Sequence, residues 1–132
     1  MTRTIDMKAL ELSFQEGDVV HAHFKNDVLG TEEDVHAMFD TIGRERHGRK
    51  ALLVVTVGEH STLTNEARAL ASGPEGDRVL AADAIVVRDF GHQLSANAFV
   101  RHNRPVRPTQ LFPDMPSALK WLGEQHHLIE TS

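Results

Sequence analysis

The chain of 132 residues contains no cysteine, no tyrosine and only one tryptophan. The absence of cysteine excludes disulfide bonds, thiolate metal sites and thiol nucleophiles. With so few aromatic side chains, the chain has little with which to stack the bases of single-stranded nucleic acids. No apolar run approaches the roughly 18 residues that a membrane-spanning helix needs, and the N-terminus MTRTIDMK lacks the apolar segment of a secretory signal. We therefore expect a cytoplasmic protein.

The composition that remains is typical of one globular domain. Hydrophobic residues make up 40% of the chain and charged residues 25%, and the formal net charge is -5. A negative chain is a poor partner for nucleic acids and for anionic membrane surfaces, because both repel it. A length of 132 residues predicts a single domain, whose core we expect between about residues 7 and 123.

The segment from Ala51 to Arg68 is the one around which we expect the domain to be organised. Residues 51–57 are apolar except for Thr56, a pattern typical of a strand buried on both faces. A polar loop follows, and then a helical pattern over residues 65–72. Strand, loop and helix make half of a βαβ unit, and open α/β sheets bind ligands at the carboxyl ends of such strands.

An antiparallel hairpin is predicted before this segment. Residues 8–14 and 19–24 both alternate between polar and apolar, as strands with one buried face do. Matching the apolar faces places Leu12 opposite Ala22, Glu11 opposite His23, and Ser13 opposite His21.

The rest of the chain alternates between helix and strand patterns. Strands are expected at residues 82–87 and 109–112, helices after Thr31, Asp89 and Asp114, and a fraying tail after residue 124. This order predicts an α/β fold, with a mostly parallel sheet of about five strands, an antiparallel N-terminal hairpin and about four helices. The helix over residues 89–103 carries Phe90, Leu94 and Phe99 on more than one face, which favours contact with a second subunit in a homodimer.

Several motifs of the chain are shared with a known group of proteins. They are Thr-x-Glu-Ala-Arg after the central strand, the Ala-rich strand AADAIVV, Pro-x-x-Pro-Thr-x-x-Phe, and the closing Ala-Leu-x-Trp-Leu. In these motifs the chain resembles, over roughly residues 50–122, the small stand-alone bacterial proteins with a SpoIIAA-like fold. STAS domains and CRAL-TRIO lipid-binding domains have the same fold. The resemblance implies the fold more strongly than a function, because most of this group has no assigned activity.

One functional feature of STAS proteins can be compared directly. STAS proteins that act as anti-sigma factor antagonists have an Asp-Ser pair at the start of the helix after the central strand, and the Ser is phosphorylated. The pair falls on Thr64 and Asn65 here. Asn65 cannot accept a phosphoryl group, and Thr64 also suits a helix N-cap, so the chain departs from the pattern of the phosphorylation switch.

A candidate ligand or partner surface lies after the two interior strands. Its members are polar residues of the two loops and helix starts: His60, Ser61, Thr62, Thr64, Asn65, Arg88, Asp89 and His92. Free N–H groups at helix N-termini suit a small anion or a partner's acidic group. The alternative is that Thr64 and Asp89 only cap helices and the others are solvated.

Two kinds of enzyme site are alternatives to this surface. A hydrolase would combine Ser61 with His60 or His92 and with Asp89, but no G-x-S-x-G turn is present to expose the serine. A zinc or iron site would use His21, His23 and Glu11 on one sheet face, and the alternative is a solvated Glu–His pair.

A basic cluster is a further candidate for contact with an acidic partner. It comprises Arg101, His102, Arg104 and Arg107.

We therefore expect a non-enzymatic regulatory module that binds a protein partner of unknown identity and needs no cofactor. The first alternative is a binder of small molecules or lipids that uses the apolar space between helices and sheet. The second alternative is a small hydrolase or metal enzyme.

Overall fold

The structure is a computed structural model that describes residues 3–130, and the side chains of all of these except residues 90, 95, 99 and 130. Its centre is a six-stranded sheet in the order β1-β2-β3-β5-β7-β8. The strands are β1 (Arg3–Asp6), β2 (Leu10–Phe14), β3 (Val19–Phe24), β5 (Ala51–Val57), β7 (Leu80–Val86) and β8 (Thr109–Phe112). The first two pairings are antiparallel and the other three are parallel. A separate parallel pair joins β4 (Leu29–Gly30) to β6 (Thr62–Leu63).

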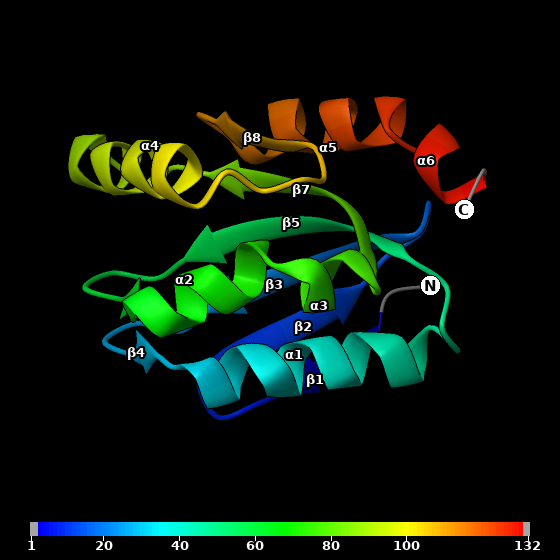
Figure 1. Cartoon of the computed structure of the whole chain (residues 1–132), viewed down its shortest axis with the longest axis horizontal. Coiled ribbons are helices and arrows are strands. Elements are labelled where there is room, and N and C mark those ends of the chain that lie inside the picture. Colours follow the sequence, from blue (N-terminus) through cyan, green and yellow to red (C-terminus); the bar gives the residue numbers. More distant parts are fainter. Residues whose placement is uncertain (1–2, 131–132) are drawn as a thin grey trace.

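Helices cover the sheet on both faces (Figure 1). They are α1 (Glu32–Glu45), α2 (Asn65–Ser72), α3 (Pro74–Asp77), α4 (Phe90–Asn103), α5 (Met115–Glu124) and α6 (His127–Glu130). Side-chain oxygens cap the four longest helices at Thr31, Thr64, Asp89 and Asp114. These residues accept backbone N–H groups that have no partner within the helix, which is why the helices begin where they do.

The central strand has the predicted bounds and the predicted place. β5 lies between β3 and β7, and its first four residues are buried. On one face, Ala51 and Leu53 pack with β2, β3 and α1. On the other face, Leu52 and Val54 pack with β7 and α5. Burial on both faces explains why the sequence of β5 does not alternate.

The hairpin register is also confirmed, because Leu12 pairs with Ala22, Glu11 with His23 and Ser13 with His21. The prediction of about five strands was one short for the main sheet. β1 pairs antiparallel with β2, and its sequence RTID contains only one apolar residue that could have indicated a strand.

The sequence predicts a fraying tail after residue 124, but the described part of the tail, residues 125–130, packs on the domain. α6 follows α5 directly, Ile129 is buried, and Leu128 packs against the same cluster as α5. The imidazole Nε2 of His126 also lies 2.7 Å from Oδ2 of Asp18, which ties this end to the turn between β2 and β3. Burial of two apolar side chains offsets the cost of ordering the tail.

Over the part of the chain that the structure describes, no helix has both the length and the apolar character to cross a bilayer. The expected apolar faces of α4 involve Phe90 and Phe99, whose side chains lie outside the described residues. Leu94 of the same helix is 55% exposed.

Candidate functional site

A pocket of about 460 Å³ opens between the sheet and helices α1, α2 and α4. It lies at the carboxyl ends of β5 and β7, where the sequence placed the candidate surface. Small-molecule sites typically measure roughly 300–1,000 Å³, so this pocket has the size of a ligand site. Most of its apolar lining comes from the sheet and from α1, including Phe24, Leu53, Val55, Ile85, Val35, Met38 and Phe39, and α2 and α4 add Ala71 and Ala96.

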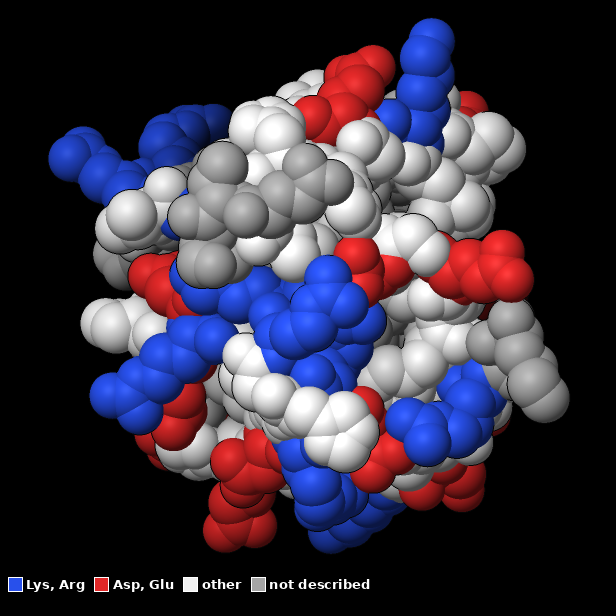
Figure 2. Space-filling view, turned by 90° about the vertical axis from the view of Figure 1, so that its right-hand side faces the viewer, with Lys and Arg blue, Asp and Glu red and all other residues white. Residues whose placement is uncertain are grey.

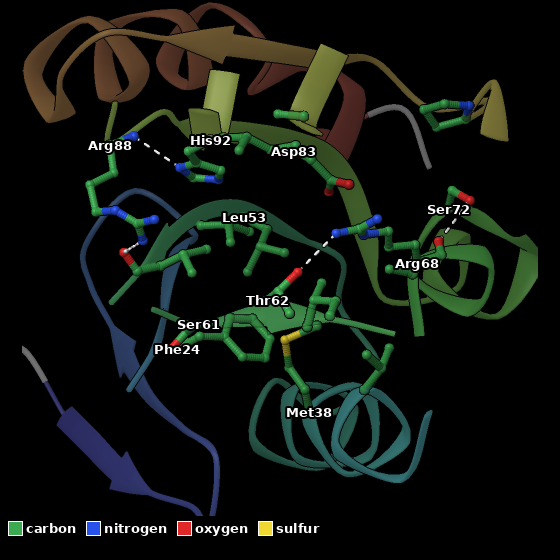
Figure 3. A pocket seen from close by; sticks show the side chains of 18 of the residues that line it. Phe24, Met38, Leu53, Ser61, Thr62, Arg68, Ser72, Asp83, Arg88 and His92 are labelled. Carbon is green, nitrogen blue, oxygen red and sulfur yellow. Dashed lines mark hydrogen bonds between the residues drawn. The ribbon is translucent and has the colours of Figure 1, made fainter. Parts of the chain in front are cut away.

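Polar side chains enter the pocket from the two loops and from α2 (Figure 3). Of the eight residues predicted for the candidate surface, five line the pocket: Ser61, Thr62, Arg88, Asp89 and His92. The strands β5 and β7 are neighbours, so the loops that follow them face each other as expected.

Arg88 connects the two loops. Its Nη1 donates to the carbonyl oxygens of Val57 and Gly58 at the end of β5. Its Nε donates to Oδ2 of Asp89 at 3.2 Å. Asp89 also caps α4 by accepting the N–H of His92 at 2.8 Å. This N–H bond and the Arg88 guanidinium hold the pKa of the Asp89 carboxyl below its usual value.

His92 has a defined hydrogen-bonding state. Its Nδ1 lies 2.9 Å from the backbone nitrogen of Arg88, which has a proton to donate. The neutral ring must therefore carry its proton on Nε2, because Nδ1 is the acceptor. Burial, and next the positive charge of Arg88, lower the pKa of the His92 imidazole, so the neutral form dominates at pH 7.

Three predicted residues do not line the pocket. His60 lies on an exposed turn with φ +62°, and its Nδ1 is 3.1 Å from Oδ1 of Asp27. Thr64 is the N-cap of α2, since its Oγ1 accepts the N–H of Ala67 at 3.0 Å. Asn65 is the exposed first residue of α2. Thr64 therefore caps the helix, which is the alternative role that the sequence predicts for it.

The side chains proposed for a hydrolase do not form a catalytic triad. The hydroxyl of Ser61 donates to the carbonyl of Lys25 and accepts the N–H of Val28 at 3.0 Å. It thus fastens the loop to the residues that follow β3. Asp89 bonds the backbone of His92 rather than its ring, so it does not orient the imidazole as the acid of a triad does.

The candidate metal residues do not line the pocket. They lie on β2 and β3, on the opposite face of the sheet. His21 Nε2 and His23 Nδ1 each lie 2.7 Å from the hydroxyl oxygen of Thr56. Among the side chains that the structure describes, no three His, Asp or Glu gather closely enough to hold a metal ion. Glu11 opposes His23 in the register but does not complete such a group.

The deep part of the pocket contains a charge network that the sequence analysis missed. Arg107 had been placed in a basic surface cluster, but it is buried (Arg107 is 7% exposed). Its Nε lies 3.1 Å from both carboxylate oxygens of Asp83, its Nη1 lies 2.7 Å from Oδ1 of Asp77, and its Nη2 donates to the carbonyl of Ala71. Burial raises the pKa of the Asp83 carboxyl, and the Arg107 guanidinium opposes this rise.

Arg68 is a second residue that the sequence analysis did not single out for the site. It projects from α2 into the pocket toward Thr62 (Figure 3). Its Nη2 donates to Oγ1 of Thr62 at 3.0 Å. The signal was present in the Thr-x-Glu-Ala-Arg motif, because Thr64 caps the helix and Arg68 follows one turn later on the same side.

The opposite end of the molecule carries a cluster of charged side chains. Figure 2 shows Lys and Arg side chains gathered there among acidic ones. The ion pairs at this end join Arg46 and Arg49 to Asp18, and Arg3 and Arg44 to Glu45. Four arginines therefore share two carboxylates at this end, each within 3.6 Å of one of them.

Comparison with known proteins supports the fold. The chain is similar to an uncharacterized protein of the DUF3478 family from Shewanella loihica PV-4, which has a SpoIIAA-like fold. The two are 15% identical, the match covers 92% of each chain, and the TM-score is 0.52. The expected SpoIIAA-like fold is thereby confirmed. No curated protein matches the sequence significantly. Residues 12–126 match the family described as a domain of unknown function (DUF7793), and the chain belongs to that family.

Proposed function

We propose that this SpoIIAA-like domain is a non-catalytic binding module whose ligand is a small, largely apolar molecule held in the pocket between sheet and helices. The observation that carries the proposal is the pocket itself, about 460 Å³ in volume. Burying apolar surface supplies affinity, at roughly 25 cal/mol per Å², and a few polar groups at the opening orient the ligand.

The polar groups of the pocket support binding rather than catalysis. A nucleophile needs a general base within hydrogen-bonding reach, but the Ser61 hydroxyl is engaged by backbone groups. The neutral His92 uses Nδ1 to accept a backbone N–H, which leaves Nε2–H as a donor. Donors can fix a bound molecule in place without changing it.

A neutral fluorescent probe, N-phenyl-1-naphthylamine, tests the proposal. We expect saturable binding with one probe per chain. Ala96→Phe on α4 and Ala71→Leu on α2 both add bulk to the lining and should weaken binding at least tenfold. Ala98→Phe changes an exposed residue of the same α4 helix that does not line the pocket, and it should leave binding unchanged. Circular dichroism establishes that each variant is folded.

Absence of saturable binding by the folded wild-type protein would contradict the proposal. So would equal binding by the two filled variants and Ala98→Phe. The second of these results would place the probe on the surface instead of in the pocket.

A protein partner, including a second copy of the chain, is the second candidate. It is favoured by two large exposed apolar side chains: Val106, which is 88% exposed and follows the lining residue Pro105 in the chain, and Leu94 of α4, which is 55% exposed. A native mass measurement of the protein from its own host separates the candidates. A retained small molecule adds a few hundred daltons to one chain, whereas a homodimer doubles the mass. Under this second candidate the domain regulates through its surface, as the STAS resemblance implies.

A further inference from the structure

The charges that line the pocket are unequal in number. Three arginines and two aspartates line it: Arg68, Arg88, Arg107, Asp83 and Asp89. No lysine or glutamate is among the lining residues. Counted as point charges with His92 neutral, the lining alone carries one positive charge in excess, which Asp77 of α3 balances through its ion pair with Arg107.

Each of the two carboxylates already has an arginine partner. Asp83 lies 2.8 Å from Nη2 of Arg107. Asp89 lies 3.2 Å from Nε of Arg88 and caps α4 as well. Asp77 of α3 is a second partner of Arg107, 2.7 Å from its Nη1, so all three carboxylates are engaged by Arg88 or Arg107.

Arg68 is the one arginine of the lining that has no carboxylate partner among the described side chains. Its guanidinium donates to the uncharged hydroxyl of Thr62 at 3.0 Å. The side chain is half-buried and points into the pocket (Figure 3). A planar guanidinium with free N–H groups is well suited to bind a carboxylate with two parallel hydrogen bonds.

Two other groups at the opening can donate hydrogen bonds to an anion. They are the Arg88 guanidinium, which pairs with Asp89, and the Nε2–H of His92, whose Nδ1 is already an acceptor. The lining also contains the apolar side chains of Leu53, Val55 and Ile85. A bound amine would face the positive charge of Arg68, which no carboxylate of the described side chains pairs, so that position disfavours cations.

Resting on the proposed function, we infer that the ligand is an apolar monocarboxylic acid whose carboxylate binds Arg68 and whose hydrocarbon part lies against β5 and β7. At the ~30 Å³ that one water occupies in the liquid, the pocket holds roughly fifteen water-sized groups. A straight-chain acid with roughly a dozen non-hydrogen atoms fits such a volume.

Displacement of N-phenyl-1-naphthylamine by decanoate, decanol and decylamine tests the inference at pH 7 and low ionic strength. The three compounds share the chain and differ in the charge of the head group. We expect decanoate to bind about tenfold more tightly than decanol, because a charge-assisted hydrogen bond is worth about that factor. Decylamine should bind more weakly than decanol.

Arg68→Gln locates the preference. The preference for decanoate over decanol should disappear in this variant, while the affinity for decanol stays within about twofold of the wild-type value. Arg101→Gln is the matched control, because it removes the same charge from an exposed residue of α4 that does not line the pocket. It should keep the preference.

The possible failures are distinguishable. If the probe binds but decanol displaces it as well as decanoate does, the inference is overturned and the proposed function stands. An equal loss of preference in Arg68→Gln and Arg101→Gln also overturns it, since the effect would then reflect net charge alone. If the probe itself does not bind, the proposed function fails, and the inference fails with it.

Discussion

Arg107 and Arg68 line the same pocket, but the structure surrounds them very differently. Arg107 is buried, and its guanidinium is saturated by two carboxylates and a carbonyl. Arg68 is half-buried and donates from its guanidinium to a single hydroxyl. The first arginine joins α2, α3 and β7, whereas the second is held at one point.

This difference separates a residue that maintains the fold from one that is available to a ligand. A buried charge must be paired, because an isolated one is very costly in a medium of low polarity. A half-exposed arginine is solvated by water until something displaces that water. Substitutions at the two positions should therefore affect different properties of the protein.

The largest effect is expected from Arg107→Met. The substitution removes the cation that Asp83 and Asp77 share, and Asp83 remains buried without a partner. Because an unpaired buried charge is costly, the free energy of unfolding should fall by about 3–5 kcal/mol. Urea denaturation measures the change. Adding Asp83→Leu removes the buried carboxylate and should recover part of the loss. If Arg107→Met alone were as stable as the wild type, the network would not be structural.

A smaller effect is expected from Gly76→Ala, which disturbs the same network without removing it. A Cβ at position 76 would lie 2.8 Å from Nη1 of Arg107 and 3.0 Å from the carbonyl oxygen of Ala71. The guanidinium must shift, at a cost of about 1–3 kcal/mol. Gly123→Ala is the matched control, because nothing lies within 4 Å of its Cβ in α5. It should stabilise the protein slightly, by about 0.5–1 kcal/mol.

A smaller pH effect is expected from His92 at the opening. The lowered pKa of His92 means that the unfolded chain binds a proton at a higher pH than the folded chain does. Unfolding therefore becomes easier as the pH falls below the ordinary histidine value of about 6.5. Between pH 7.5 and 5.5, the free energy of unfolding should fall less in the His92→Gln variant than in the wild type. Urea denaturation at both pH values measures this difference. Parallel losses in the two proteins would contradict this assignment.

The smallest effect on stability is expected from Arg68→Gln. Its guanidinium makes one partly exposed hydrogen bond and no ion pair with the described residues, so the free energy of unfolding should change by less than about 0.5 kcal/mol. Thermal unfolding without ligand measures this change. A loss comparable with that of Arg107→Met would mean that both arginines are structural, and the contrast between them would disappear.

Much of the fold could be predicted from local patterns. The bounds of β5, the start of α1 at Thr31 and the Leu12–Ala22 register all follow from apolar spacing and helix caps. β1 could not be found in this way, because its strand state depends on pairing with β2 more than on its own composition. α6 is short, and its order comes from tertiary burial of Ile129.

The candidate site was predicted less completely. Five predicted residues follow the ends of β5 and β7, and this position alone was enough to identify them as neighbours: Ser61, Thr62, Arg88, Asp89 and His92. The partnership of Asp83 and Arg107 joins residues 24 positions apart, which no local pattern reveals. An aspartate inside the apolar run AADAIV was the one sign that a buried cation was needed.

The position of β1 has a consequence for how the protein behaves at high concentration. β1 and β8 form the two outer edges of the main sheet, and each is only four residues long. β1 also carries Arg3 and Asp6, which pair with Glu45 and Lys25. Short edges offer few free backbone groups for strand addition by another molecule, and at β1 the charged side chains oppose it further. We therefore expect edge-to-edge aggregation to be disfavoured, more strongly at β1 than at the uncharged β8.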